Sequence, residues 1–309
     1  MSVPAKLLAF AALLAATFGI AVAAGAAFGP EETTKPAAGH GDMARDDRSG
    51  DDHGAADADA MPAGEHGGSG DGGHGAEEPG GLSAAQDGYR LAPATTTLTA
   101  GRRTRFTFRI LGPDGRPVRR GYELESEREL HLVVVRRDTG DFLHLHPTRA
   151  ADGTWSVDLR LPRAGVHRAF ADFVVGGKRR TLGVDLFAPG DFRPEPWPAP
   201  AAVARGEGFD VALPDAALHA GKSAELAFAV RRDGRAPELE PYLGARGHLV
   251  ALREGDLAYL HVHPEEGGGP AGEIRFATAF PTPGRYRLFL QFQTEGRVRT
   301  VARTVEVER

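Results

Sequence analysis

The sequence contains no cysteine among its 309 residues. That absence excludes disulfides, thiolate metal ligands and a cysteine nucleophile. Methionine is nearly missing too: Met1, Met43 and Met61 all precede the part expected to fold, so a Met-rich Cu(I) site is not expected there. Basic residues do not cluster with aromatic residues, which argues against nucleic-acid binding. No nucleophile–base spacing, phosphate loop or carboxylate pair stands out, and we do not expect an enzyme.

Long apolar runs are also absent, except for one near the N-terminus. Residues 7–29 are 23 consecutive uncharged and mostly apolar positions, preceded by Lys6. About 20 apolar residues span a bilayer as a helix, whereas a signal peptide has a shorter apolar core before an Ala-x-Ala site. We expect residues 1–30 to be a transmembrane anchor or a signal peptide. Either one places the remainder outside the cytoplasm, at the cell membrane if the anchor is kept or secreted if it is cleaved.

Aliphatic and aromatic residues are scarce in residues 31–87, which are rich in Gly, Asp, Ala and His. Such a segment cannot bury enough apolar surface to offset the entropy lost on ordering, so we expect a disordered tether. Its histidines, His40, His53, His66 and His74, have no fixed spacing. A solvated tether is therefore favoured over a metal-collecting tail.

The rest of the chain is an internal duplication. Asp114-Gly115-Arg116 returns as Asp233-Gly234-Arg235, and the segments on either side of these turns match as well. We expect one domain at residues 88–191, a Pro-rich linker at 192–207 and a second domain at 208–309, each domain having the size of a small β-sandwich.

Each repeat lacks a helical period and shows about seven short apolar or alternating runs between Gly, Pro and Asp turns. In the first repeat these runs lie near residues 89–92, 104–111, 130–136, 142–146, 155–161, 166–174 and 179–187. Seven short strands are typical of an immunoglobulin-like β-sandwich, so the predicted fold class is all-β, with two tandem sandwiches. Tyr286 is similar to the tyrosine corner of such folds, and His167 at the equivalent position is interpreted as a core or corner residue.

One histidine-rich segment occurs in each repeat. It reads HLVVVRRDTGDFLHLHP at residues 131–147 and HLVALREGDLAYLHVHP at residues 248–264. Both copies place three histidines at the same spacing: His131, His144 and His146 in the first, and His248, His261 and His263 in the second. These two segments hold six of the twelve histidines. A short polar turn in each copy predicts a β-hairpin.

The turn determines which side chains share a face of the hairpin. If Asp138-Thr139 forms the centre of the first turn, facing residues have numbers that sum to 277, and His131 lies opposite His146. With Gly255-Asp256 at the centre of the second turn the sum is 511, and His248 lies opposite His263. Alternation along the strand then places the middle histidine of each triplet on the same face, opposite the core-facing leucines.

In an immunoglobulin-like strand order, the sixth strand of each repeat lies beside the third, which carries His131 or His248. The sixth strands contain Asp172 and Gln291, so this order would bring Asp172 near the first triplet and Gln291 near the second. Asp172 is a candidate fourth ligand, or an acceptor for an imidazole N–H. Gln291 is a poorer ligand, so we expect the two sites to differ in charge and affinity.

Metal binding is the function that three convergent histidines favour, because imidazole is a common ligand of Zn²⁺ and Cu²⁺ and the spacing does not choose between the two. A structural histidine cluster is the main alternative. The candidate metal residues are His131, His144, His146, Asp172, His248, His261 and His263.

The duplicated HL…HxHP pattern, with YLGARGHLVALREGDLAYLHVHP at residues 242–264, resembles uncharacterised cell-envelope proteins of actinobacteria that are often described as heavy-metal-binding. The repeats look like the YtkA-like group of extracytoplasmic β-sandwiches and, more distantly, CopC-type copper carriers. The resemblance covers roughly residues 88–309 and implies an immunoglobulin-like fold and metal handling, with copper favoured. Unlike CopC-type carriers, the chain has no histidine near a sandwich N-terminus and no methionine cluster.

The leading hypothesis is an extracytoplasmic, membrane-tethered protein that buffers or delivers Cu²⁺ or Zn²⁺ with one three-histidine cluster per sandwich. Its expected partners are the metal ion and the membrane, through residues 7–29. The alternative is a non-catalytic envelope scaffold that contacts another envelope protein. A histidine-ligated metalloenzyme is a third hypothesis.

Overall fold

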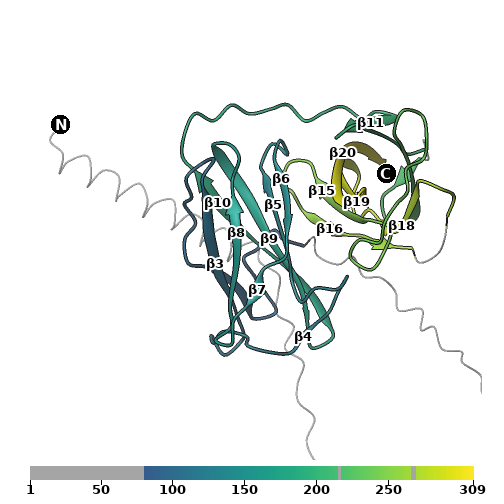
Figure 1. Ribbon diagram of the computed structural model, residues 1–309. Coiled ribbons are helices and arrows are strands. Elements are labelled where there is room, and N and C mark those ends of the chain that lie inside the picture. Colours follow the sequence, from purple (N-terminus) through teal and green to yellow (C-terminus); the bar gives the residue numbers. More distant parts are fainter. Residues whose placement is uncertain (1–79, 215–216, 266–268) are drawn as a thin grey trace, which may run out of the picture. The chain divides into compact units, whose positions relative to one another are not determined.

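The computed structural model describes residues 80–214, 217–265 and 269–309, all within one of the chain's two compact units, residues 70–309. The predicted anchor or signal peptide and most of the predicted tether lie outside these residues. The described part is all-β, as predicted, and forms two tandem β-sandwiches (Figure 1). No helix in it is long and apolar enough to cross a membrane.

The first sandwich is built from two sheets of antiparallel strands. One sheet has the strand order β1-β2-β3-β8-β7, and the other has the order β10-β9-β5-β6 with β4 also paired to β9. The strands are β1 (Ala85–Gln86), β2 (Tyr89–Pro93), β3 (Arg103–Leu111), β4 (Tyr122–Glu123), β5 (His131–Arg136), β6 (Phe142–Leu145), β7 (Thr148–Arg149), β8 (Thr154–Arg160), β9 (Gly165–Val175) and β10 (Lys178–Ala188). The seven predicted runs correspond to β2, β3, β5, β6, β8, β9 and β10.

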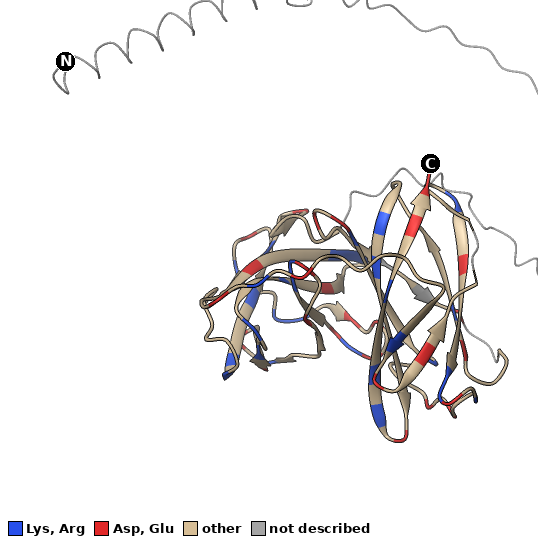
Figure 2. Cartoon of the chain, turned by 90° about the horizontal axis from the view of Figure 1, so that it is seen from above, with Lys and Arg blue, Asp and Glu red and all other residues tan. Residues whose placement is uncertain are grey.

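The second sandwich repeats this plan. Its sheets have the orders β11-β12-β14-β18-β17 and β13-β20-β19-β15-β16, with β13 parallel to β20. The strands are β11 (Val203–Gly206), β12 (Phe209–Ala212), β13 (Leu218–His219), β14 (Ser223–Arg231), β15 (His248–Arg253), β16 (Tyr259–His261), β17 (His263–Pro264), β18 (Glu273–Ala279), β19 (Gly284–Thr294) and β20 (Arg297–Glu308). Figure 2 shows acidic and basic residues interspersed over the strands of both sandwiches.

Alternation along the strands places the core of each sandwich between its two sheets. In β3 the buried Phe106, Phe108 and Ile110 alternate with exposed or half-buried polar side chains. The second core contains Tyr286, whose hydroxyl donates a hydrogen bond to the Thr282 carbonyl oxygen at 3.0 Å. That bond is the predicted tyrosine corner.

The predicted register of both hairpins is confirmed. In the first, β5 and β6 pair Leu132 with Leu145 and Val133 with His144, so facing residues sum to 277. In the second, Val250 faces His261, which gives the predicted sum of 511. The middle histidine of each triplet therefore has the cross-strand neighbour that the predicted turn implied: Val133 for His144 and Val250 for His261.

The predicted pairing of His248 with His263 does not form. β16 ends at His261, and the chain then crosses to the opposite sheet, where His263 in β17 pairs with Ala277 of β18. The crossing occurs at Val262, whose buried side chain belongs to the core of the second sandwich. A hairpin register alone cannot predict such a change of sheet.

Two domain boundaries also differ from the prediction. Residues 203–206, expected in the linker, form β11 and pair with β12. Residues 80–83, expected in the tether, form a strap that contacts both sandwiches. Gly81 N donates to the Thr181 carbonyl oxygen at 2.8 Å, and Tyr259 N donates to the Gly80 carbonyl oxygen at 2.9 Å. Composition misses such a segment because backbone groups, rather than apolar side chains, attach it.

Glycine at position 183 allows this strap to lie against β10. A Cβ atom at Gly183 would lie only 2.0 Å from the Gly81 carbonyl oxygen. Arg168 fixes the strap further, because its Nη2 donates to the carbonyl oxygens of Gly81 and Leu82 at 2.7 Å each. The strap is therefore part of the folded unit.

The two sandwiches pack against each other through the outer faces of the β5 and β15 sheets. Phe142 stacks on Phe289 with ring centroids 4.1 Å apart, and Phe170 contacts Tyr259 with centroids 5.3 Å apart. Phe142 and Tyr259 occupy equivalent positions in the two repeats, as do Phe170 and Phe289. The two contacts are thus related by exchange of the repeats, and the interface has a local pseudo-twofold symmetry.

Candidate metal centre

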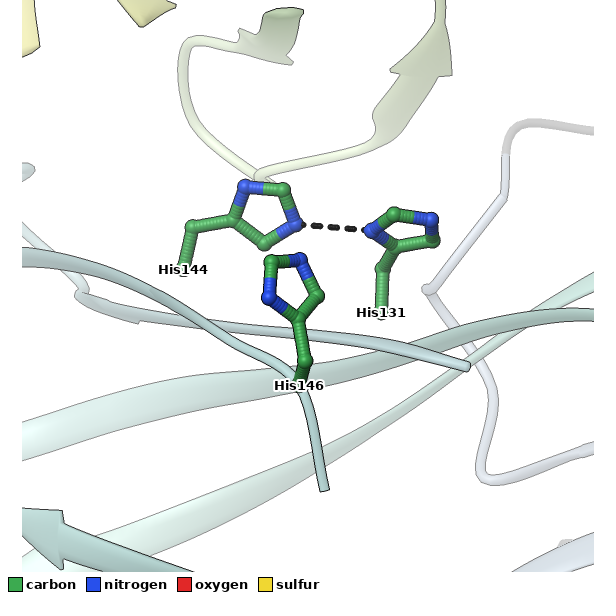
Figure 3. A group of neighbouring side chains, drawn as sticks. All are labelled: His131, His144 and His146. Atoms are coloured by element: carbon green, nitrogen blue, oxygen red, sulfur yellow. Dashed lines mark hydrogen bonds between the residues drawn. The ribbon is translucent and has the colours of Figure 1, made fainter. Parts of the chain in front are cut away.

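The three histidines of the first hairpin converge on the face that is turned away from the sandwich core. His131 begins β5, His144 lies in β6 and His146 follows directly after it. Leu143 and Leu145 pack against the core, as predicted, and alternation turns the histidines to the opposite face. One ring nitrogen from each histidine lies within 4.8 Å of the others (Figure 3).

His131 and His144 meet directly, and each ring has a second polar neighbour. Nδ1 of His131 lies 3.0 Å from Nε2 of His144. On the outer side, His131 Nε2 lies 2.9 Å from the Glu125 carbonyl oxygen, and His144 Nδ1 lies 2.6 Å from Gln291 Oε1. Both outer neighbours are oxygen acceptors, so each outer nitrogen carries a proton and donates it.

When both rings are neutral and protonated on their outer nitrogens, the inner nitrogens carry lone pairs. In that form His131 Nδ1 and His144 Nε2 face each other across 3.0 Å with no proton between them, whereas a proton on either nitrogen makes the contact a hydrogen bond. Two such lone pairs repel each other unless a proton or a cation lies between them. Metal-ligating histidines have this arrangement, with the outer N–H bound to an oxygen acceptor and the inner lone pair on the metal.

His146 adds a third candidate nitrogen ligand to the cluster. Its ring centroid lies 4.8 Å from that of His144 and 5.2 Å from that of His131. Its Nε2 is buried and has no hydrogen-bond partner among the described residues. A buried polar atom without a partner is costly, and a metal ion would satisfy it.

The environment keeps these rings in the neutral form that binds metals. Burial, followed by the neighbouring His131 and Arg128, lowers the pKa of His146 to about 4. Burial also holds the pKa of His144 well below its usual value, and the nearby imidazoles of His248 and His131 add to the effect. His146 therefore stays uncharged at neutral and mildly acidic pH, and burial favours the neutral form of His144 as well.

The second repeat contributes His248 to the same cluster. Its ring stacks on His131 with centroids 5.4 Å apart and on His144 with centroids 4.7 Å apart. Only 5% of His248 is exposed. The side chains of His261 and His263 lie outside the described part of the structure. The described cluster thus includes a histidine of the second repeat, and the predicted second cluster of His248, His261 and His263 stays a prediction.

Asp172 lies next to the cluster, as predicted from the strand order. It pairs with His131 across β5 and β9, and Gln291 pairs with His248 across β15 and β19. The Asp172 carboxylate accepts hydrogen bonds from Thr181 Oγ1 at 2.9 Å and from Arg179 Nη1 at 3.2 Å. It does not belong to the group of nitrogens that come together within 4.8 Å.

Sequence reasoning placed Gln291 on the correct face and beside His248 of the second triplet, but it did not predict a second contact. Its amide contacts His144 of the first repeat, because the two histidine faces pack against each other. The outward-facing Phe170 and Phe289 were the available signal for this packing. The Glu125 carbonyl oxygen could not be found from sequence, since it depends on the loop before β5.

An open cavity of about 500 Å³ reaches the cluster from one side. It is lined by residues of both repeats: Glu127, Arg128, His144, His146, Pro241, Tyr242, Leu243, Gln291, Gln293, Val298 and Thr300. His144 and His146 therefore face a space that solvent and small solutes can enter. His131 and His248 are not among the described residues that line this cavity.

The strand orders and the repeated topology define a pair of tandem immunoglobulin-like domains. The family described as "Domain of unknown function (DUF8832)" matches the sequence twice, at residues 84–189 and 202–309, and the chain belongs to this family. No curated protein matches the sequence. The resemblance to YtkA-like and CopC-type proteins stays a prediction.

Solved structures with a similar fold share little sequence with the chain. The Lin-41 filamin domain is 12% identical, with 36% of this chain and 97% of that one covered and a TM-score of 0.25. The Escherichia coli adhesin FdeC is 13% identical, with coverages of 73% and 65% and a TM-score of 0.24. The Yersinia pseudotuberculosis adhesin InvE is 13% identical, with coverages of 70% and 58% and a TM-score of 0.21. The chain thus spans less than two thirds of either adhesin chain, and at these TM-scores the likeness carries no inference about function.

Proposed function

We propose that this protein binds Cu²⁺ or Zn²⁺ through the cluster of His131, His144 and His146, and buffers or delivers the ion outside the cytoplasm. The observation that carries this proposal is the close approach of the inner ring nitrogens of His131 and His144, each ring having an oxygen acceptor beside its outer nitrogen. Residues 7–29 would hold the protein at the membrane as an anchor, or direct its secretion as a signal peptide.

The spacing of the three rings supports a tetrahedral or related site. With metal–nitrogen bonds of about 2.0–2.1 Å, the ligand nitrogens of a tetrahedral ion lie roughly 3.3–3.4 Å apart. His131 and His144 are already near that separation, at 3.0 Å. The widest nitrogen spacing in the group, 4.8 Å, would have to close by roughly 1.5 Å, which rotation of side chains can supply.

The second triplet belongs to the same proposal. His248 packs on the first cluster, and we retain His261 and His263 as candidate ligands, with Asp172 as a nearby acceptor that favours bound cations. If the six histidines act together the protein takes up one ion per chain, and if they act separately it takes up two.

Titration of the full chain with Cu²⁺ and Zn²⁺ tests the proposal. The four predicted tether histidines, His40, His53, His66 and His74, are first replaced by Gln, so that only the folded part can bind tightly; we call this protein the tether-substituted chain. We expect at least one tight equivalent. His144→Ala and His146→Ala should each weaken it by at least about 100-fold, because losing a ligand exceeds the cost of losing an outer-sphere partner.

His219→Ala provides the matched control, since His219 lies in β13 outside the cluster and should leave the affinity unchanged. Circular dichroism of each variant verifies the fold. Undiminished binding in both cluster variants would remove the proposal.

A second candidate function is a non-catalytic envelope scaffold with structural histidines. One observation favours it: an apolar cluster that includes Val133, Phe170, Val250 and Phe289 already joins the two sandwiches without a metal. On that hypothesis the His→Ala variants lose stability, but the parent protein binds no metal tightly. Recovery of the same membrane partner in the presence of a chelator would then support the scaffold.

A further inference from the structure

The candidate metal centre borders an open cavity and is not enclosed in the protein core. His144 and His146 line the cavity of about 500 Å³, whereas His131 is not among its described lining residues and has only 3% of its surface exposed. An ion held by the three rings would therefore meet protein on one side and the cavity on the other. Three protein ligands with one open position define a site that accepts an exchangeable ligand.

The charged residues of the cavity wall indicate which ligand chemistry fits. Among the described residues of the lining, only Arg128 and Glu127 carry full charges, and these two offset each other. An imidazole that ligates a metal ion is itself uncharged. A bound divalent ion would thus leave the cavity with a net charge of two positive units, which favours an anion over a neutral ligand.

Arg128 is the residue placed to select that anion. It lines the same cavity as His146 and Tyr242, and its charge is felt by both: it adds to the burial that lowers the pKa of His146 and opposes the burial that raises the pKa of Tyr242. Its Nη1 donates to the neighbouring Glu127 carbonyl oxygen at 2.9 Å, and no ion pair to Arg128 is present among the described residues. A guanidinium has five N–H donors in a fork that suits carboxylate and other planar anions.

The neutral polar groups of the wall complete the site. Gln291 and Gln293 extend from β19 into the lining, and Tyr242 and Thr300 add hydroxyl groups. Gln293 Nε2 is already bound to Glu240 Oε2 at 2.7 Å, which holds that amide in place. The cavity thus brings together two histidines that face the candidate metal position, several neutral polar side chains and the guanidinium of Arg128.

We propose that this cavity binds a small anion, of the carboxylate class, that completes the coordination of the metal and contacts Arg128. The inference rests on the proposed metal-binding function. It makes the centre an exchange site, at which the ion is captured or released together with an anionic ligand. Anion and metal would then strengthen each other's binding, as linkage requires.

The test uses the tether-substituted full chain loaded with one equivalent of Cu²⁺ and titrated with azide, acetate or neutral imidazole. Azide and acetate should change the visible absorption of the bound Cu²⁺ with saturable curves. Arg128→Gln should weaken both anions by about three- to fivefold, the effect of one charge pair at an exposed position. Glu127→Gln should strengthen both anions by a similar factor. Neither variant should alter the affinity for imidazole.

Arg102→Gln serves as the matched control, because Arg102 is exposed and lies outside the cavity lining. No spectral change with either anion would overturn the inference while leaving the metal site intact. Equal shifts for anions and imidazole would overturn it as well, since access rather than charge would then control binding. Failure of Cu²⁺ to bind in the preceding titration would refute the proposed function, and this inference with it.

Discussion

The two repeats carry different chemistry at one equivalent pair of positions. Asp172 and Gln291 both lie opposite the first histidine of their hairpin, and both are buried. Each bonds the equivalent threonine on the next strand: Thr181 Oγ1 donates to Asp172 at 2.9 Å, and Gln291 Nε2 donates to Thr300 at 3.1 Å. The duplication has kept the backbone and the threonine, and changed the charge.

The change of charge is accompanied by a second one. Arg179, which donates to Asp172, has Val298 at the equivalent position of the second repeat. Removing a buried carboxylate and its arginine together avoids an unpaired charge, which would be far more costly than losing the pair. The neutral amide that remains is able to reach across the interface to His144. The repeats thus differ at two coupled positions: the first has a buried ion pair between Asp172 and Arg179, and the second has a neutral amide that contacts the other repeat.

The largest predicted losses of stability are at equivalent positions where the two repeats have the same residue. Phe170→Ala and Phe289→Ala should each lower the free energy of unfolding by about 3–5 kcal/mol, since both rings are buried in the interface. Urea denaturation measures both losses, and Leu124→Ala, at a side chain that is 70% exposed, is the control. A large loss for one phenylalanine and none for the other would break the pseudo-symmetry of the interface.

Acid should destabilise the metal-free protein because the half-buried His146 of the first repeat must take up a proton. The pKa of His146 is lowered to about 4, with His131 and Arg128 facing it, so its neutral form stabilises the fold above an unfolded-state pKa of about 6.5. That stability should fall by about 2 kcal/mol as the pH drops from about 6.5 towards 4, after a reduction for partial exposure.

Thermal unfolding between pH 7 and 4 measures this dependence. His146→Gln should flatten the profile, because the substituted side chain no longer takes up a proton. His219→Gln, in the second repeat, should leave the slope as it is. An unchanged slope in the His146 variant would assign the acid sensitivity to other groups.

The altered position in the second repeat should control metal affinity in the first. Gln291→Leu removes the acceptor for His144 Nδ1, and should weaken Cu²⁺ or Zn²⁺ binding by at least about tenfold. Gln291→Glu, with a stronger acceptor, should retain or tighten binding. The two variants are compared by metal titration, and equal affinities for both would show that this contact does not orient the ring.

The smallest expected loss of stability is at the tyrosine corner, where the second repeat has Tyr286 and the first has His167. Tyr286→Phe removes the hydrogen bond to the Thr282 carbonyl and should cost about 1 kcal/mol. The first repeat has the buried His167 there and offers no equivalent bond to remove. Tyr89→Phe is the control, because no hydrogen bond to its hydroxyl is present among the described contacts. Chemical denaturation would distinguish the two variants.

Much of this architecture follows from local patterns in the sequence. Alternation in β3 and β19, the turn residues and the repeated spacing predicted the strands, both hairpin registers and the pairing of Asp172 with His131. These features depend on neighbours along a strand or across a turn, which strand periodicity determines.

The site required information that strand patterns do not hold. Whether His144 meets Gln291 depends on how one sandwich packs on the other, and the sequence showed only that both faces carry an outward phenylalanine. The strap was missed for a similar reason. Gly80 and Gly81 attach through backbone hydrogen bonds to partners about 100 or more residues away, Thr181 and Tyr259, which a composition count cannot detect.

The pseudo-twofold interface has a consequence for the origin of the protein. His131 and His248 are equivalent positions that touch each other, so the symmetry axis passes between their rings. A surface that pairs with its own copy is what a symmetric homodimer uses. A single-repeat ancestor with this face would have met a second ancestor molecule through it. Fusion of two such genes would have allowed the halves to change separately, and the equivalent positions Asp172 and Gln291 are one place where they now differ.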